Sequence, residues 1–168
     1  MGEPDERRGD LAISTDPSRL DRALIRSFLA ASYWAPGIPQ NVVDRSIENS
    51  LCFGVYDGPA QVGFARVITD FATYAYVADV FVLEAQRGRG VGLWLMRTIR
   101  AHPRLQGLRR WSLKTRDAHG LYRQVGFVVD EHPERTMEIL DRDVYRRSPA
   151  SGNPSPPPLS RGERGEET

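Results

Sequence analysis

The sequence is poor in cysteine, in lysine and in net charge, and two of these shortages exclude a class of protein. Cys52 is the single cysteine among 168 residues, which excludes an intramolecular disulfide framework and a zinc site built from cysteines. Basic residues number 23 and acidic residues 22, and this net charge of +1 argues against a protein that binds duplex nucleic acid. Lys114 is the one lysine, so that arginine supplies the rest of the basic charge.

Long hydrophobic runs are also missing. No apolar stretch approaches the roughly 18–20 residues that a membrane span needs, and the polar start MGEPDERRGD is not a secretory signal. We therefore expect a soluble cytoplasmic protein that contacts no membrane. The three histidines, His102, His119 and His132, do not have the spacing of metal ligands, so we expect no metal.

The composition is that of a globular protein, with 40% hydrophobic and 27% charged residues. We expect residues 1–10 to form a flexible N-terminus and residues 11–147 to form one folded domain. Residues 148–168 are rich in proline, serine, glycine and charge, which predicts a disordered tail.

Hydrophobic periodicity and turn residues predict a mixed order of strands and helices. Asp16 followed by Pro17 is typical of a helix start, and this helix is predicted to run to about Ser32. A shorter helix is predicted around residues 42–47, ending near Asn49. The remaining predicted helices cover residues 91–102 and 117–124, and the predicted strands cover residues 11–15, 51–56, 61–69, 71–83, 108–114, 127–129 and 135–140. This order predicts an α/β protein of the α+β kind, with a mixed sheet, rather than a doubly wound parallel sheet.

A glycine-rich turn, Arg87–Gly92, follows the longest predicted strand and leads into a helix. Glycines allow close approach of the backbone to a ligand, and a helix N-terminus offers free amides and a positive dipole end. With two arginines, this combination predicts a site for a diphosphate, and a plain surface turn is the alternative. No lysine follows as in a nucleoside-triphosphate loop, and Leu93 stands where a dinucleotide fingerprint needs its third glycine.

The spacing Arg87-x-x-Gly90-x-Gly92 resembles the acyl-CoA loop of the GNAT superfamily of N-acetyltransferases. A second segment, AHGLYRQVGF from Ala118 to Phe127, resembles the Ala-x-x-Leu-Tyr-x-x-x-Gly-Phe motif of that family. The segments SYWAPGIPQ and NSLCFGVYDG are similar to one branch of small bacterial acetyltransferases. The resemblance implies the GNAT acyl-CoA N-acyltransferase fold, a mixed central sheet with splayed fourth and fifth strands flanked by helices.

The resemblance also implies a site for acetyl-CoA, which is the cosubstrate of the family. The main chain of Val80, Phe81 and Val82 is expected to pair with the pantetheine arm and to polarise the thioester carbonyl. The pyrophosphate is expected to lie on a cofactor-binding turn formed by Arg87, Gly88, Arg89, Gly90, Val91 and Gly92. Tyr122 matches the family tyrosine that serves as general acid, and a packed core tyrosine is the alternative.

The acceptor side of the site is less fully specified by sequence. Asp79 is an ionisable residue in an apolar strand, so it either accepts the amine proton or forms an ion pair with an arginine such as Arg66. Tyr33, Trp34 and Tyr76 are predicted to bind the acceptor, with ordinary packing as the alternative for Tyr33 and Trp34.

We therefore predict an acetyl-CoA-dependent N-acetyltransferase that acts on a primary amine of a small molecule or peptide by direct attack in a ternary complex. The alternative is a non-catalytic module of the same fold that binds or senses acyl-CoA. The partners expected are acetyl-CoA and an amine acceptor, with no nucleic acid, and a homodimer is left open because dimers are common in the superfamily.

Overall fold

The computed structural model describes residues 5–147, and it builds them around one sheet of six strands. The strands follow one another across the sheet in chain order, and each pair of neighbours is antiparallel except β5 and β6, which are parallel. The strand bounds are β1 Glu6–Arg8, β2 Leu11–Ser14, β3 Leu51–Asp57, β4 Ala60–Thr69, β5 Tyr74–Val82 and β6 Arg110–Ser112.

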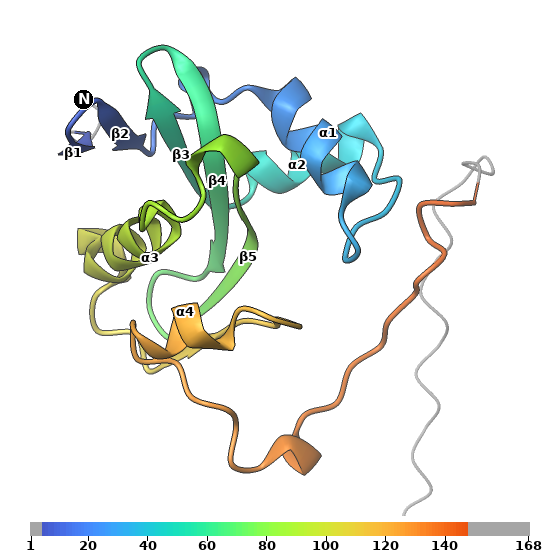
Figure 1. The fold of residues 1–168 in the computed structure, drawn as a ribbon. Helices are drawn as coiled ribbons and strands as arrows, with labels where there is room; N and C mark the ends of the chain where they lie inside the picture. The colour runs from blue at the N-terminus through green and yellow to red at the C-terminus, as the bar shows by residue number, and fades with distance from the viewer. Residues whose placement is uncertain (1–4, 148–168) are drawn as a thin grey trace, which may run out of the picture.

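Helices cover both faces of this sheet. Their bounds are α1 Arg22–Ala31, α2 Gln40–Glu48, α3 Val91–Ala101 and α4 His119–Arg123. Helices α1 and α2 lie together on one side and α3 on the other, while α4 follows β6 (Figure 1). This arrangement confirms the mixed α/β architecture that the sequence predicted.

Each face of the sheet has its own hydrophobic core. On the α3 side, Leu95, Met96 and Ile99 pack on the inward side chains of the sheet, among them Phe53. On the other side, a second core joins α1 and α2 to the sheet through buried side chains that include Ile25, Leu29, Val43, Ile47, Phe64 and Phe81. The amphipathic spacing of these helices explains the two layers, because each helix buries one stripe of its surface.

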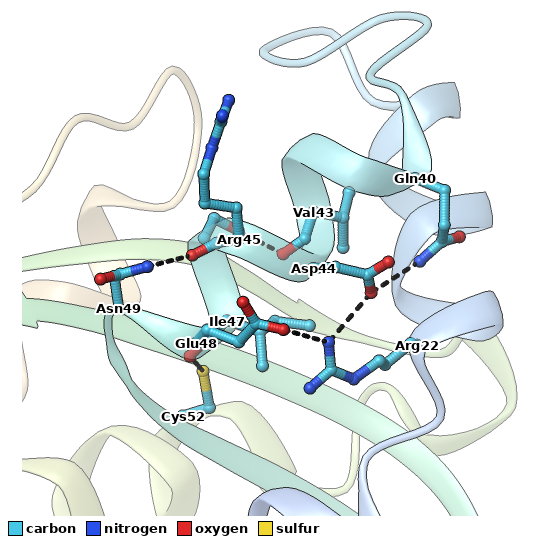
Figure 2. Close-up of polar contacts among 10 residues, drawn as sticks. Arg22, Gln40, Val43, Asp44, Arg45, Ile47, Glu48, Asn49 and Cys52 are labelled. Carbon is cyan, nitrogen blue, oxygen red and sulfur yellow. Dashed lines mark hydrogen bonds and ion pairs between the residues drawn. The ribbon is translucent and has the colours of Figure 1, made fainter.

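Polar contacts join α1 to α2 and α2 to the sheet (Figure 2). Arg22 on α1 donates to the Asp44 carboxylate at 3.1 Å and to the Glu48 carboxylate at 3.4 Å, and both acceptors lie on α2. The Cys52 thiol lies 3.7 Å from the Ile47 carbonyl oxygen at the end of α2. Burial raises the pKa of this thiol to about 12, so Cys52 is a packed core residue and not a thiolate.

Three elements in the first half of the chain differ from the sequence prediction. Asp16 caps only a short 3₁₀ turn, Pro17–Arg19, and the first α-helix begins later, where the Asp21 carboxylate accepts the Leu24 amide at 2.9 Å. Strand β1 pairs with β2 although the sequence predicted no strand there. The predicted strand from residue 71 begins only at Tyr74, because residues 70–73 form the turn between β4 and β5.

The two predicted strands at residues 127–129 and 135–140 are wrong for this single chain. The structure has a 3₁₀ turn at Pro133–Arg135 and no strand after β6 among residues 5–147, so that β6 is left as an edge. The predicted disordered tail, residues 148–168, lies outside the described residues. Across residues 5–147, no helix is both long enough and apolar enough to span a membrane.

Candidate active site

Strand β5 carries an extra residue near its middle, and this bulge shapes the site. The β4 residues Phe64 and Arg66 are two positions apart, but their β5 partners, Phe81 and Ala78, are three apart. The extra residue makes β5 bend locally and leave the regular ladder. Asp79 lies in this bulge with φ of 55°, in the left-handed region, where aspartate is tolerated better than most residues.

The bulge reverses which side chains of β5 face which core. Ala75 and Val77 belong to the core under α3, and beyond the bulge Val80 and Val82 pack against that same core. A regular alternation would instead place residue 79 on the side of 75 and 77. The bulge therefore turns Asp79 toward the opposite face, the one that α1 and α2 cover.

Strands β5 and β6 separate at the same point. They pair only at Tyr74–Tyr76 on β5 and Arg110–Ser112 on β6. Across residues 5–147, no other strand pairs with β5 on this side, so residues 77–82 present an open backbone edge toward the gap. This is the splay of neighbouring strands that the sequence resemblance implied. An open strand edge binds an extended ligand through main-chain amides and carbonyls.

Asp79 is held by two side chains. Its Oδ2 accepts a hydrogen bond from Nε of Arg66 at 2.8 Å, and its Oδ1 accepts one from Nε1 of Trp34 at 3.2 Å. Arg66 also donates to the Ser50 hydroxyl at 3.1 Å. Both partners of the ion pair are largely buried, with side chains 15% and 11% exposed. Of the two predicted readings of Asp79, the ion pair with Arg66 is therefore formed.

The predicted acceptor residues lie on the same side of the sheet. The Tyr33 and Trp34 rings meet edge to face, with centroids 5.0 Å apart, in the loop after α1. The Arg116 guanidinium, from the loop after β6, lies 4.0 Å above the Tyr33 ring centroid. The cation on this ring is thus supplied by the chain itself, and the contact connects the two loops on either side of the strand gap.

Tyr122 lies on α4 and is buried, in edge-to-face contact with Phe127 at a centroid distance of 6.0 Å. Burial raises the pKa of its phenol to about 12, and the charges of Tyr33, Asp117 and Tyr76 add to this effect. Burial likewise raises the pKa of Tyr76. Tyr122 packs in the core under α3, which is the alternative that the sequence analysis gave for it, and its role as general acid stays a prediction.

Among the predicted cofactor-binding residues on β5, Phe81 is the one whose side chain lies in the α1–α2 core. Its ring stacks on Phe28 of α1, with centroids 3.9 Å apart and planes inclined by 11°, and it is buried in the α1–α2 core. Its main chain is paired with Phe64 of β4, so a ligand-binding role for Phe81 stays a prediction.

The predicted glycine turn leads directly into α3. Gly88 and Gly90 have φ of 75° and 74°, a left-handed conformation that favours glycine. Gly90 is the N-terminal cap of α3, and in the described part of the chain no side chain caps this end. The first amides of α3 therefore have no intrahelical acceptor, and the dipole of the helix makes this end positive.

Arg8, on β1, contacts this turn, and the sequence did not predict this contact. Its guanidinium donates to the carbonyl oxygens of Arg89 and Gly90, each at 3.3 Å, across 81 and 82 positions of sequence. Arg87 is fixed by a bond of 2.9 Å from its Nε to the Val82 carbonyl. Nothing in the local sequence signals the contact of Arg8, because it depends on the pairing of β1 with β2. Arg8 thus places its guanidinium against Gly90, the residue that caps α3.

Comparisons with known proteins agree with this architecture. Residues 48–129 match the model of the acetyltransferase (GNAT) domain family. A protein of Gibberella zeae, named as a candidate acetyltransferase, is 33% identical over 138 residues, which cover 68% of this chain and 77% of that protein.

Solved structures extend the likeness. A candidate GNAT-family acetyltransferase from Xanthomonas campestris pv. campestris is 49% identical, with a TM-score of 0.79 over 82% of this chain and 97% of that chain. A candidate acetyltransferase from Clostridium acetobutylicum, crystallised with acetyl-CoA, shares the fold at 14% identity, with a TM-score of 0.59 over 77% of this chain and 96% of that chain. The chain belongs to the GNAT superfamily of acetyltransferases.

Proposed function

We propose that this protein transfers the acetyl group of acetyl-CoA to a primary amine of a small molecule or peptide. The observation that carries the proposal is the open edge of β5, residues 77–82, which lies directly before the uncapped start of α3. An extended arm that pairs with this edge and ends in a diphosphate matches the two features together.

The residues present fit coenzyme A. A side chain at Gly88 or at Gly120 would meet no atom within 4 Å, so both glycines leave open space beside the turn and beside α4. The start of α3, with Arg8, Arg87 and Arg89 near it, supplies positive charge for the diphosphate. The side of β5 that no described strand pairs at Val80 and Val82 supplies main-chain groups for the pantetheine arm, although the Val82 carbonyl accepts a hydrogen bond from Arg87.

When bound, acetyl-CoA supplies an acetyl group activated as a thioester. The acceptor nitrogen forms a bond to the acetyl carbon and releases one of its protons to solvent, and the carbon–sulfur bond breaks. The departing sulfur takes up a proton, and the group that donated this proton regains one from solvent, so the products are an amide and a thiol. We assign Tyr122 as the donor of that proton, because a phenol with a pKa of about 12 is fully protonated at neutral pH. A backbone amide of residues 80–82 stabilises the negative charge that develops on the carbonyl oxygen.

We assign Asp79 a positioning role within this proposal. Both of its carboxylate oxygens accept hydrogen bonds, so the side chain fastens the bulge to β4 and to the loop of Trp34. A role as acceptor of the amine proton stays a prediction. The engaged carboxylate is also the one observation that favours the second candidate, a module that binds acyl-CoA without turnover.

The test is a titration of the purified protein with acetyl-CoA by calorimetry, combined with CoA release across a panel of amine acceptors. Gly92→Glu places a carboxylate in the first turn of α3 and is expected to weaken acetyl-CoA binding at least 100-fold. Gly92→Ala is the matched control, because the added Cβ meets only the Leu121 side chain at 3.7 Å, an ordinary contact. Equal affinity of both variants and the wild type would contradict the site.

A further inference from the structure

Arg8 reaches the glycine turn because the register of the first two strands directs its side chain toward α3. Strands β1 and β2 are joined by the two residues Gly9 and Asp10, and Arg8 lies directly opposite Leu11 in the ladder. Side chains that lie opposite each other in an antiparallel pair project from the same face of the sheet. Leu11 belongs to the core under α3, so Arg8 projects from the face that α3 covers.

The two carbonyl groups that Arg8 holds belong to consecutive peptide units. Its guanidinium donates to the carbonyl oxygens of Arg89 and Gly90, each at 3.3 Å. Both peptide units are trans, and in a planar trans unit the amide hydrogen points away from the carbonyl oxygen. The Arg89 carbonyl shares its unit with the amide of Gly90, and the Gly90 carbonyl shares its unit with the amide of Val91. Arg8 therefore directs these two amides toward the opposite side of the turn.

The side of the turn on which Arg8 lies does not suit a phosphate group. A cavity of about 280 Å³ on this side is lined by Arg8 and Arg89, and also by the acidic residues Asp10 and Asp57. Two carboxylates repel an anion that enters this cavity. The two amides point away from the cavity, so a diphosphate bound to them is separated from Arg8 by the backbone of the turn.

The charge of Arg8 has the wrong sign for a contact that serves the fold alone. The dipole of α3 makes its N-terminus positive, and the first turn of α3 contains no acidic residue. Among residues 5–147, Arg8 forms no ion pair that would offset its own charge. A cation beside the positive end of a helix is unfavourable in the protein without ligand, and an anion bound to the amides reverses this effect.

We propose that Arg8 is a positioning residue for the diphosphate of coenzyme A, an inference that rests on the proposed function. It acts through the peptide units of residues 89–91 and not by contact with the phosphates. Its planar guanidinium bridges two carbonyl oxygens and fixes the direction of two amides before the ligand arrives. Donors that are fixed in advance bind a ligand more tightly, because less conformational freedom is lost on binding.

The test is a calorimetric titration of acetyl-CoA into the wild type, Arg8→Met, Arg8→Lys and Arg7→Met. We expect Arg8→Met to weaken binding about three- to tenfold, the contribution of about one net hydrogen bond. Arg8→Lys keeps the charge but cannot bridge both carbonyls, so it should recover little of the loss. Arg7→Met is the matched control, because it removes the same charge from a side chain on the other face of β1, and it should bind as the wild type does.

Two further measurements separate positioning from other roles of Arg8. Dephospho-CoA keeps the diphosphate and lacks the 3′-phosphate, so Arg8→Met should weaken the binding of CoA and of dephospho-CoA by the same factor. A loss for CoA alone would show direct contact with the 3′-phosphate and would overturn the proposal. Without ligand, the Tm of Arg8→Met should equal or exceed that of the wild type, and a Tm several degrees lower would make Arg8 a contact of the fold.

The titration also distinguishes failure of this inference from failure of the proposed function. If the wild type binds acetyl-CoA and Arg8→Met binds it equally well, the role of Arg8 is wrong and the proposed function stands. Full recovery of affinity by Arg8→Lys, or an equal loss in Arg7→Met, shows that charge alone matters and also overturns the positioning role. If the wild type binds no acetyl-CoA, the proposed function fails and the role of Arg8 fails with it.

Discussion

Tyr122 combines burial with a phenol that keeps its proton, and both follow from its place on α4. The same burial occurs at Tyr56, whose pKa is also raised to about 12 and whose hydroxyl has no hydrogen-bond partner among the described residues. The two tyrosines differ in where they lie, because Tyr56 is on β3 and Tyr122 is on α4, the helix that follows β6. They therefore form a matched pair for testing the proposed acid.

We expect Tyr122→Phe to lower kcat by about 10²–10⁴-fold, the usual contribution of a general acid, and to leave the affinity for acetyl-CoA unchanged. Tyr56→Phe is expected to keep full activity and to be no less stable than the wild type, since it removes an unsatisfied buried hydroxyl. Steady-state kinetics and calorimetry measure both. Full activity of Tyr122→Phe would remove the tyrosine from the mechanism, and a protein with no turnover for any acceptor would favour the binding module.

The ion pair between Asp79 and Arg66 is expected to matter for stability as well as for geometry. Asp79→Ala leaves the Arg66 guanidinium buried without its carboxylate, and removing one member of such a pair costs about 3–5 kcal/mol. The double variant Asp79→Ala with Arg66→Met should recover much of this loss, because neither charge then remains buried. Urea unfolding of the wild type, of Asp79→Ala, of Arg66→Met and of the double variant gives the coupling. A loss below about 1 kcal/mol for Asp79→Ala would show that solvent or another group replaces the carboxylate.

At the scale of elements, the sequence predicted the parts whose signal is local. The turn at residues 57–59, the hairpin around it, the strand before the glycine turn and the helix that begins at Val91 all depend on neighbouring residues. The bulge at Asp79 was not predicted. Because β5 has apolar residues on both faces, the pattern of apolar and polar residues does not show which side chains face which core. The strands expected at residues 127–140 have strand-like sequence, but within residues 5–147 they pair with no other strand, and a strand depends on such pairing as well as on its own residues.

The turn between β4 and β5 is an element whose stability depends on pH. The Asp70 carboxylate accepts the amides of Ala72, Thr73 and Tyr74 at 3.0, 2.8 and 3.1 Å, and the Thr73 hydroxyl at 2.6 Å. These bonds, with the Thr73 hydroxyl first among them, hold the pKa of Asp70 well below its usual range. A carboxyl with a lowered pKa in the folded state stabilises that state above the unfolded pKa of about 4 and loses this contribution as the pH falls.

We therefore expect the urea midpoint of the wild type to fall between pH 5 and pH 2.5 by more than that of Asp70→Asn, which cannot be protonated. Asp130→Asn is the comparison variant, because the Asp130 carboxylate accepts one amide, that of His132, at 3.0 Å. It is expected to follow the wild type. An identical pH dependence for the wild type and Asp70→Asn would show that this turn does not contribute.

For the molecule as a whole, sequence motifs predicted the family, and contacts between distant segments required the structure. The two motifs, which begin at Arg87 and at Ala118, each consist of residues that are close together in the chain. Their spacing can therefore be recognised in the sequence alone. The guanidinium of Arg8 reaches the glycine turn only because β1 closes the far edge of the sheet. The contact of Arg116 with Tyr33 likewise joins two loops 83 positions apart. No local pattern encodes either contact.

The two hydrophobic cores also define how much of the chain the fold needs. The apolar residues of both cores in the described chain lie between Leu11 and Tyr145, which packs on the α1–α2 core. We expect a chain that ends at Arg147 to keep the Tm and the acetyl-CoA affinity of the full chain, since every core residue in the described part of the chain is retained. A chain that ends at Leu140 is the informative comparison, because it loses Tyr145 and should melt several degrees lower, as a loss of about 1 kcal/mol does in a domain of this size. Differential scanning calorimetry measures the Tm of both shortened chains. A large drop in Tm on removal of residues 148–168 alone would show that this segment belongs to the folded unit.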